Sequence, residues 1–307
     1  MITALAGGVG AARFLEGLVR VAKEEISIIV NTGDDIELYG LNISPDIDIV
    51  IYTLAGIVDS EKGWGIKGDT FHCLAELQKF GYETWFMLGD KDLATHIHRT
   101  MLLKKGFKLS EIVEKECGTL GVKVNIIPMT DDKVKTIIVS EKGEMHFQEY
   151  MVKRKTQDKV LQIKFEGIEM ARPAHGVIDS IIKSRIIIIC PSNPIVSIGT
   201  ILSIKKIRES LRSTKAKIIG ISPLIGGKTV KGPADKLMDS LGMEVSSYAV
   251  AKLYSDFLDA FVIDIIDKNL KERIESLGIR VFETDTLMRG LQKKIELAKF
   301  TLEAIES

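Results

Sequence analysis

The hydrophobic residues of this chain form short runs that alternate with amphipathic stretches. Runs rich in β-branched residues predict strands at Ile2–Ala6, Ile26–Val30, Ile49–Thr53, Thr84–Leu88, Val122–Ile127, Ile186–Cys190 and Ile218–Ser222. Some are apolar throughout, as in the four consecutive isoleucines from residue 186, which is typical of parallel strands covered on both faces. The alternation predicts an α/β fold with a Rossmann-like, doubly wound and mostly parallel sheet.

Helical periodicity fills the segments between these runs. It predicts helices over Ala11–Lys23, Thr70–Phe80 and Leu93–Lys105, and a C-terminal helix from about Leu287 for which Asp285 would be the N-cap.

Two regions depart from the alternation of strands and helices. Residues 93–121 predict a small helical insertion, and Thr136–Glu166 predicts antiparallel strands. Because the chain has no repeat and no long linker, we expect residues 1–307 to form a single unit.

Composition excludes several classes of protein. The 42 basic residues (Lys and Arg) balance 42 acidic residues, so we expect neither a nucleic-acid nor an anionic-membrane partner. Cys73, Cys117 and Cys190 lie far apart, which excludes a disulfide framework and a cysteine zinc site and fits the cytoplasm. The uncharged segment 186–204 contains two prolines, so it predicts a buried strand and a turn and not a membrane span.

The first candidate site is the glycine turn Gly7-Gly8-Val9-Gly10, which follows the first predicted strand. Glycines there would let a phosphate approach backbone N–H groups at a helix N-terminus. Arg13 replaces the third glycine of a dinucleotide fingerprint, and the second strand leads into Asn31 and not into a ribose-binding acid. Anion binding is the interpretation that this position favours, and a tight turn without a ligand is the alternative.

Two later loops offer similar backbone donors. Ser192 and Asn193 follow the isoleucine strand, and Asn193 would cap a helix that begins at Pro194. The segment Gly226-Gly227-Lys228-Thr229 fails the Walker A spacing, because Ser222 stands where the first glycine is required. For this second loop a phosphate-facing role and a solvated turn both stay open.

Carboxylates gather in loops beside the predicted strands. Asp46 and Asp48 precede the predicted strand Ile49–Thr53, and side chains two apart in extended chain point the same way, so both would face one site. Further acids in such loops are Asp34, Asp35, Asp69, Asp90, Asp92, Asp131 and Asp132. Carboxylates of this kind can bind Mg²⁺, which bridges protein acids and substrate phosphates, although each acid alone is more often a turn former or a helix cap.

Histidine spacing argues against a zinc site. His96 and His98 are two apart on a predicted helix, so at most one of them faces a site. The residues by themselves therefore predict a soluble α/β enzyme or binder for a phosphorylated ligand, with Mg²⁺.

Several motifs carry more information through their order than any of them does alone. They are Ala6–Leu15, Ser44–Asp48, Leu88–His96, Pro128–Asp132, His146–Glu149, Pro191–Gly199, Ser222–Gly227 and Asp285–Met288. Together they resemble the 2-phospho-L-lactate transferases of coenzyme F-420 biosynthesis over nearly the whole chain.

The resemblance implies transfer of 2-phospho-L-lactate from lactyl-2-diphospho-5'-guanosine to the deazaflavin Fo, with release of GMP and formation of coenzyme F-420-0. It further implies Mg²⁺ and a cytoplasmic homodimer. Asp46 and Asp48 would be catalytic and would bind the metal, and the residues implied in substrate binding are Gly7, Gly8, Gly10, Asp48, Asp69, Asp90, Lys91, His96, Ser192 and Asn193. His96 and Asp90 are expected to line one pocket. Lys91 departs from the arginine common in the family, which removes a bidentate contact to phosphate, and Trp64 could stack on the deazaflavin or lie in the core.

Other functions stay open beside this one. A related fold serves non-catalytic, nucleotide-sugar-binding regulators of the gluconeogenesis-factor type. An NAD-dependent oxidoreductase is disfavoured by the broken glycine fingerprint. Within the transferase hypothesis, the donor could carry lactate, phosphoenolpyruvate or glycerate.

Overall fold

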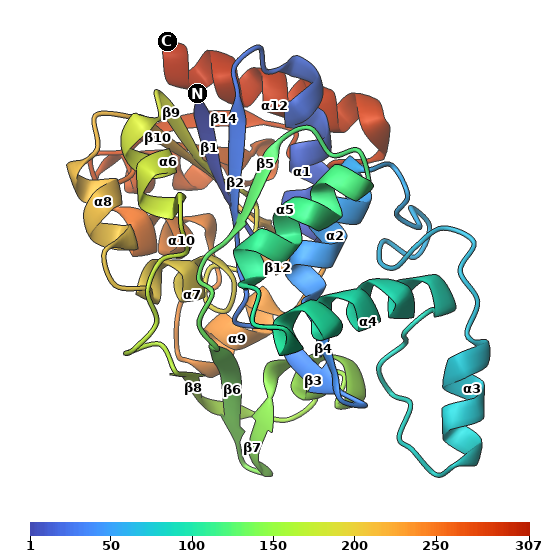
Figure 1. Ribbon diagram of the computed structural model, residues 1–307. Coiled ribbons are helices and arrows are strands. Elements are labelled where there is room, and N and C mark those ends of the chain that lie inside the picture. The colour runs from blue at the N-terminus through green and yellow to red at the C-terminus, as the bar shows by residue number, and fades with distance from the viewer.

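The computed structural model describes residues 1–307, which are built around a seven-stranded parallel sheet (Figure 1). The strand order is β14-β13-β10-β9-β1-β2-β5. The bounds are β1 Ile2–Ala6, β2 Ile26–Val30, β5 Asn125–Pro128, β9 Ile186–Ile189, β10 Lys217–Ile221, β13 Ala260–Asp264 and β14 Arg280–Thr284. The predicted α/β class with a parallel sheet is confirmed.

The strand order reverses beside β1. The chain runs outward from β1 to β2 and β5, and then returns to place β9 on the other side of β1, where Ile2 is in register with both Ile26 and Ile186. From β1, the chain therefore leads to strands on one side, and from β9 it leads to strands on the other side. A sheet of this type binds ligands at such a point, outside the carboxyl ends of the strands.

Helices cover both faces of the sheet and account for the apolar strands. One face packs against α1 (Gly8–Val21), α2 (Pro45–Leu54), α5 (Leu109–Thr119) and α12 (Gly290–Glu306). The other packs against α6 (Val177–Lys183), α7 (Ile198–Ser203), α8 (Ile207–Ser213), α10 (Ser247–Tyr254) and α11 (Lys271–Glu275). Ile186 and Ile188 belong to the first core, and Ile187 and Ile189 belong to the second. All four isoleucines are thus buried, as the uninterrupted run predicts.

The remaining elements lie outside the main sheet. The strands β6 (Lys135–Ser140), β7 (Gly143–His146) and β8 (Val160–Glu166) form an antiparallel sheet, which confirms the prediction for that region. Short hairpins are formed by β3 (Ile36–Leu38) with β4 (Leu41–Ile43) and by β11 (Leu224–Ile225) with β12 (Lys228–Thr229). The other helical segments are α3 His72–Lys79, α4 Asp90–Lys104, a π-helical turn Glu149–Lys153, α9 Ala234–Ser240 and a 3₁₀ segment Ile265–Leu270.

Residues 93–121 comprise most of α4 and all of α5. The two helices differ in their surroundings, because α5 contributes Val113 and Cys117 to the core of the sheet. Helix α4 extends toward α3, which stands apart from the sheet at the right of Figure 1. No helix of the structure combines the length and the apolar character that crossing a bilayer requires.

Three predictions about local structure are wrong. The run Ile49–Thr53 is the second half of α2, which begins at Pro45 and is buried all round, so that no polar stripe marks its helical period. Thr84–Leu88 is an irregular segment between α3 and α4. Asp285 does not cap the C-terminal helix, because α12 begins at Gly290 and the Asp285 carboxylate accepts a hydrogen bond from the Leu287 N–H.

Candidate functional site

The loops that follow β1 and β9 meet at the point where the strand order reverses. The backbone N–H of Gly7 donates to Ser192 Oγ at 3.2 Å. A Cβ atom on Gly10 would lie 2.3 Å from the carbonyl oxygen of Pro191, so only glycine allows this contact. The predicted glycine turn and the predicted Ser192-Asn193 loop are therefore brought together at one edge of the sheet.

The N-terminus of α1 already faces a carboxylate in this structure. Gly8 is the first residue of α1 and adopts a φ of 72°, a conformation that favours glycine. No acidic residue occupies the first turn of α1. The Asp46 carboxylate instead lies at the backbone N–H of Gly8, where the helix dipole favours negative charge.

Asn193 closes a turn and does not cap a helix at Pro194. Its Oδ1 accepts hydrogen bonds from the N–H groups of Ile195 and Val196 at 2.9 and 3.2 Å, and α7 begins only at Ile198. The Nδ2 group of Asn193 is buried and has no hydrogen-bond partner. An unpartnered N–H donor beside Ser192 is suited to donate a hydrogen bond to a ligand oxygen.

Asp46 is held in a buried polar setting. It lies in the first turn of α2, is 6% exposed, and accepts a hydrogen bond from Asn31 Nδ2 at 2.9 Å. Burial raises the pKa of Asp46 to about 6, although the hydrogen bond from Asn31 opposes that shift. At neutral pH this carboxylate is ionised, yet it forms no ion pair.

Two further acids, Asp34 and Asp35, lie near Asp46 and belong to the loop that follows β2. Each has an Oδ1 atom that is buried without a hydrogen-bond partner. Burial and the negative charge of Asp46 raise the pKa of Asp34, and burial raises that of Asp35 despite a hydrogen bond from Ser44 Oγ at 2.7 Å. We call Asp34, Asp35 and Asp46 the edge carboxylates.

The edge carboxylates fit a cation that arrives with a substrate. Burial raises the pKa of all three acids, and a divalent cation bound among them would favour their ionised forms. No group of three or more potential ligands is arranged to hold a metal ion. Mg²⁺ commonly takes only one or two protein carboxylates and completes its shell with waters and substrate phosphates. Asp34 and Asp46 are the residues that would hold it.

Asp48 faces a different environment from Asp46, which overturns the expectation that both point to one site. In a helix, side chains two residues apart are separated by about 200°. Asp48 pairs through both oxygens with the fully buried Arg99, whose Nη1 lies 3.1 Å from Asp48 Oδ2. Arg99 also donates to Glu116 Oε2 at 2.9 Å. Because Arg99 takes both oxygens, the structure does not place Asp48 as a metal ligand.

His96 extends this buried cluster. It is 1% exposed, and its Nε2 lies 3.3 Å from Asp92 Oδ1 while its Nδ1 lies 3.8 Å from Asp48 Oδ2. Tyr52 donates its hydroxyl to Asp92 Oδ1 at 2.7 Å. His98 is exposed, which confirms that the two histidines diverge. We call Asp48, Tyr52, Asp92, His96, Arg99 and Glu116 the Arg99 network.

Asp69 and Asp90 exchange helix caps across a turn. Asp69 accepts hydrogen bonds from the N–H groups of Lys91 at 2.8 Å and Asp92 at 3.0 Å, at the start of α4. Asp90 accepts from the N–H groups of His72 at 3.0 Å and Cys73 at 2.9 Å, at the start of α3. Their carboxylates are thus occupied by backbone.

Asp90 and His96, which are expected to line one pocket, have different partners in the structure. The side-chain partners of Asp90 all lie between residues 70 and 73, whereas His96 is enclosed by the Arg99 network. Lys91 is exposed, and its Nζ donates to the carbonyl oxygen of Gly68 at 3.2 Å. Trp64 is 41% exposed and so is not a core residue.

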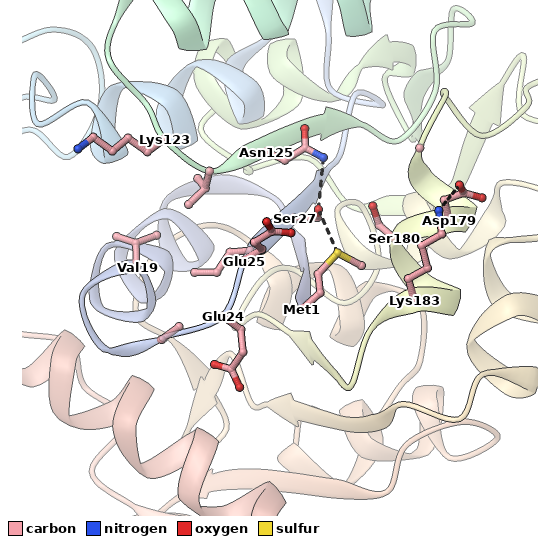
Figure 2. A pocket seen from close by; sticks show the side chains of 14 residues that line it. Met1, Val19, Glu24, Glu25, Ser27, Lys123, Asn125, Asp179, Ser180 and Lys183 are labelled. Atoms are coloured by element: carbon pink, nitrogen blue, oxygen red, sulfur yellow. Dashed lines mark hydrogen bonds and ion pairs between the residues drawn. The ribbon is translucent and has the colours of Figure 1, made fainter.

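The opposite edge of the sheet carries a separate hollow of about 510 Å³ (Figure 2). It lies at the amino ends of β1, β2 and β5, where Ser27 Oγ is 3.3 Å from Asn125 Nδ2 and 4.0 Å from the sulfur of Met1. None of the predicted site residues lines it. Buried polar atoms without a hydrogen-bond partner lie elsewhere, both among the edge carboxylates and within the Arg99 network.

Comparisons with known proteins agree over the full length of the chain. Residues 2–300 match the family model described as 2-phospho-L-lactate transferase CofD. A phosphoenolpyruvate transferase of Streptomyces griseus is 42% identical, with 99% of this chain and 98% of that protein covered. A 2-phospho-L-lactate transferase of Methanocaldococcus jannaschii is 41% identical, with 99% and 97% covered. A solved structure of an upf0052-family protein from Bacillus halodurans aligns with a TM-score of 0.62 at 15% identity, covering 100% of this chain and 98% of the other, and that likeness shows the fold alone.

Proposed function

This chain belongs to the 2-phospho-L-lactate transferase CofD family, and we propose that it transfers 2-phospho-L-lactate from lactyl-2-diphospho-5'-guanosine to the deazaflavin Fo. The terminal ribityl hydroxyl of Fo attacks the phosphorus that carries lactate. An oxygen–phosphorus bond to Fo forms, and the bond from that phosphorus to the oxygen of GMP breaks. GMP leaves with the electron pair, and coenzyme F-420-0 is the product.

The edge carboxylates carry this proposal. Phosphoryl transfer depends mainly on alignment and on neutralising charge, so a cluster of unpaired acids beside a helix N-terminus suits a metal–diphosphate substrate. Asp34 and Asp46 would hold Mg²⁺, which supplies positive charge to the diphosphate. The proton of the attacking hydroxyl passes to a carboxylate at this edge. We assign Asp48 to positioning, because Arg99 occupies it.

Backbone and side-chain donors on the other side of the edge would bind the diphosphate. Gly7, Gly8 and Gly10 form the turn at the N-terminus of α1, where N–H groups favour anions. Across from them, Ser192 and the unpartnered Nδ2 of Asn193 add donors from the loop after β9. A diphosphate here would lie among these N–H and O–H donors, beside the Asp46 carboxylate at the Gly8 N–H.

Phosphoenolpyruvate is a second candidate for the transferred group. Relatives named phosphoenolpyruvate transferase and relatives named 2-phospho-L-lactate transferase match this chain equally well, at 42% and 41% identity. The two donors differ in one unsaturated bond next to the same carboxylate and phosphate. Both therefore belong in the same assay.

We also propose a cytoplasmic homodimer. Phe80, Tyr82, Ile97 and Met101 are each at least 46% exposed and lie on α4 and on the segment that joins it to α3. Exposed apolar side chains on consecutive segments of the chain are candidates for an interface, and the three free cysteines fit a reducing compartment. Sedimentation equilibrium of the purified chain would give twice the 34.0 kDa monomer mass, and a monomer at micromolar concentration would contradict the dimer.

The decisive experiment is a mass-spectrometric assay with Fo, Mg²⁺ and each donor in turn, with EDTA as a control. We expect Fo to gain one phospholactyl group with stoichiometric GMP, and the reaction to stop in EDTA. Asp46→Asn is expected to lower the rate by roughly 10²–10³-fold, whereas Asp179→Asn, a matched change at an exposed acid paired with Lys183, is expected to leave the rate unchanged. Product from the phosphoenolpyruvyl donor alone would replace lactate in the proposal. Binding of a nucleotide sugar, with no product from either donor, would favour the regulator.

A further inference from the structure

Two cationic side chains converge near the carboxyl edge without a counter-charge. Arg13 belongs to α1, and Lys231 belongs to the loop that follows β12. A Cβ atom on Gly63 would lie 2.4 Å from Lys231 Nζ and 3.7 Å from Arg13 Nη2. Both charged groups therefore approach one point, from elements that are far apart in the sequence.

Neither cation is satisfied by the protein. Arg13 makes no side-chain hydrogen bond, and the Lys231 Nζ group donates only to the carbonyl oxygen of Lys62, at 3.1 Å. The neighbouring Lys62 pairs with Asp59 at 3.4 Å, and Arg20 on the same helix pairs with Glu16 at 3.4 Å, whereas Arg13 and Lys231 pair with no carboxylate. Burial and the charge of Arg13 lower the pKa of Lys231, which agrees with two like charges near one another.

The position of the pair ties it to the site. Arg13 lies five residues after Gly8, about 7.5 Å along α1 from the N-terminus that faces Asp46. The segment that carries Lys231 follows β10 and so leaves the same carboxyl edge of the sheet. A ligand that starts at the glycine turn and extends along the edge would reach both cations.

We propose that Arg13 and Lys231 form an anion subsite that binds a phosphate or carboxylate group of the nucleotide donor. A planar guanidinium can hold two oxygens of such a group, and the ammonium of Lys231 adds a third charged hydrogen bond. The anion removes the repulsion between the two cations, so the subsite is favourable only when it is filled. The identity of the donor rests on the proposed function, whereas the anion subsite does not.

The test measures donor binding in Arg13→Gln and Lys231→Gln, with Arg20→Gln as the matched control on the same helix. The dissociation constant of the complete donor is expected to rise tenfold or more in each of the first two variants and to stay unchanged in the control. KM for the donor should rise in parallel while kcat changes less. Their thermal stability in the absence of ligand should be equal to or above that of the unmodified chain, because one of two like charges is gone; a purely structural pair would instead lower it.

Two ligands separate the sources of the anion. If the subsite binds the diphosphate, the variants lose affinity for GDP as well as for the complete donor. If it binds the carboxylate of the transferred acid, they lose affinity for the complete donor and keep their affinity for GDP. Inorganic pyrophosphate in a thermal-shift assay reports on the edge without any turnover, so a failure of the proposed reaction does not obscure the result. Unchanged affinity for the complete donor, GDP and pyrophosphate in both folded variants would overturn the proposal.

Discussion

The edge carboxylates and the Arg99 network each take one acid from the first turn of α2, and these two acids differ in how their charge is compensated. Asp46 reaches the glycine turn of α1, where its partners, Asn31 Nδ2 and the Gly8 N–H, are neutral and no cation pairs with it. Asp48, two residues later, accepts hydrogen bonds from both terminal nitrogens, Nη1 and Nη2, of the buried Arg99. Helix α2 thus presents one acid, Asp46, without a cationic partner and a second acid, Asp48, paired with Arg99.

Under the proposed function, we expect the edge carboxylates to serve the chemistry and the Arg99 network to serve the structure. A buried carboxylate without a partner costs stability, and such groups concentrate at functional sites. In the Arg99 network the shifts are mixed: burial raises the pKa of Glu116, whereas for Asp92 burial is outweighed by contacts with His96, Tyr52 and Arg99, which lower its pKa. The network joins α2, α4 and α5, and so it fixes the helix that presents Asp46.

The largest expected effect comes from removing the cation of the network. Arg99→Met would leave Asp48 and Glu116 buried without compensation, and we expect the free energy of unfolding to fall by about 3–5 kcal/mol. Urea unfolding followed by circular dichroism measures this. Arg212→Met, at an exposed arginine paired with Asp256, is the control and should change stability by less than about 1 kcal/mol. A loss for Arg99→Met no larger than that of the control would show that the network does not stabilise the fold.

Removing the charge of Asp46 or of Asp48, one at a time, tests directly whether the two acids have different roles. Asp46→Asn is expected to lower kcat by roughly 10²–10³-fold, because a group that neutralises transition-state charge is lost, without loss of stability. Asp48→Asn is expected to lower the free energy of unfolding, because Arg99 then loses an ionic partner. Rate measurements and unfolding curves on both variants suffice. The comparison breaks if Asp46→Asn destabilises the chain as much as Asp48→Asn does.

The pH dependence of stability gives a smaller effect with a defined sign. The pKa of Asp46 is raised to about 6, above the unfolded value of about 3.9, so the folded chain binds this proton more tightly. Its contribution to stability is therefore gained as the pH falls from 7 to 4, and it is on the order of 2–3 kcal/mol.

His146 acts in the opposite direction within the same pH range. Burial lowers its pKa to about 4, so its contribution is lost as the pH falls. The informative quantity is thus the difference between the unmodified chain and Asp46→Asn at each pH, measured by denaturant unfolding without metal. A difference that does not change between pH 7 and 4 would mean that Asp46 is not the titrating group.

Strands of the main sheet are predictable because their environment repeats along the chain. A strand covered on both faces needs uninterrupted apolar residues, and β9 with its four isoleucines meets that condition. The same rule fails for α2, whose residues from Asp46 to Thr53 are all buried. A helix enclosed on every side shows no polar stripe, so its sequence resembles a buried strand.

Site residues are predictable only as far as they lie next to a recognisable turn. The glycine turn and Ser192 are candidates because they follow strands, whereas Asp46 is a candidate for its place before an expected strand that the structure shows to be helix α2. Arg99 carries no local signal, because its partners Asp48 and Glu116 come from two other helices. Asp69 and Asp90 show the converse, because they look like site acids in the sequence. In the structure Asp69 caps the start of α4 and Asp90 caps the start of α3.

The smallest expected effect removes one neutral donor from the Arg99 network. Tyr52→Phe deletes the hydroxyl that donates to Asp92 Oδ1 at 2.7 Å and leaves the ring in place. We expect a loss of about 1 kcal/mol in the free energy of unfolding, since Asp92 keeps His96 as a partner, and a rate within twofold of normal. Tyr82→Phe, at a 54% exposed tyrosine, is the control and should be neutral. If Tyr52→Phe slowed the reaction as strongly as Asp46→Asn, the network would take part in the chemistry, and the division between the two groups of acids would fall.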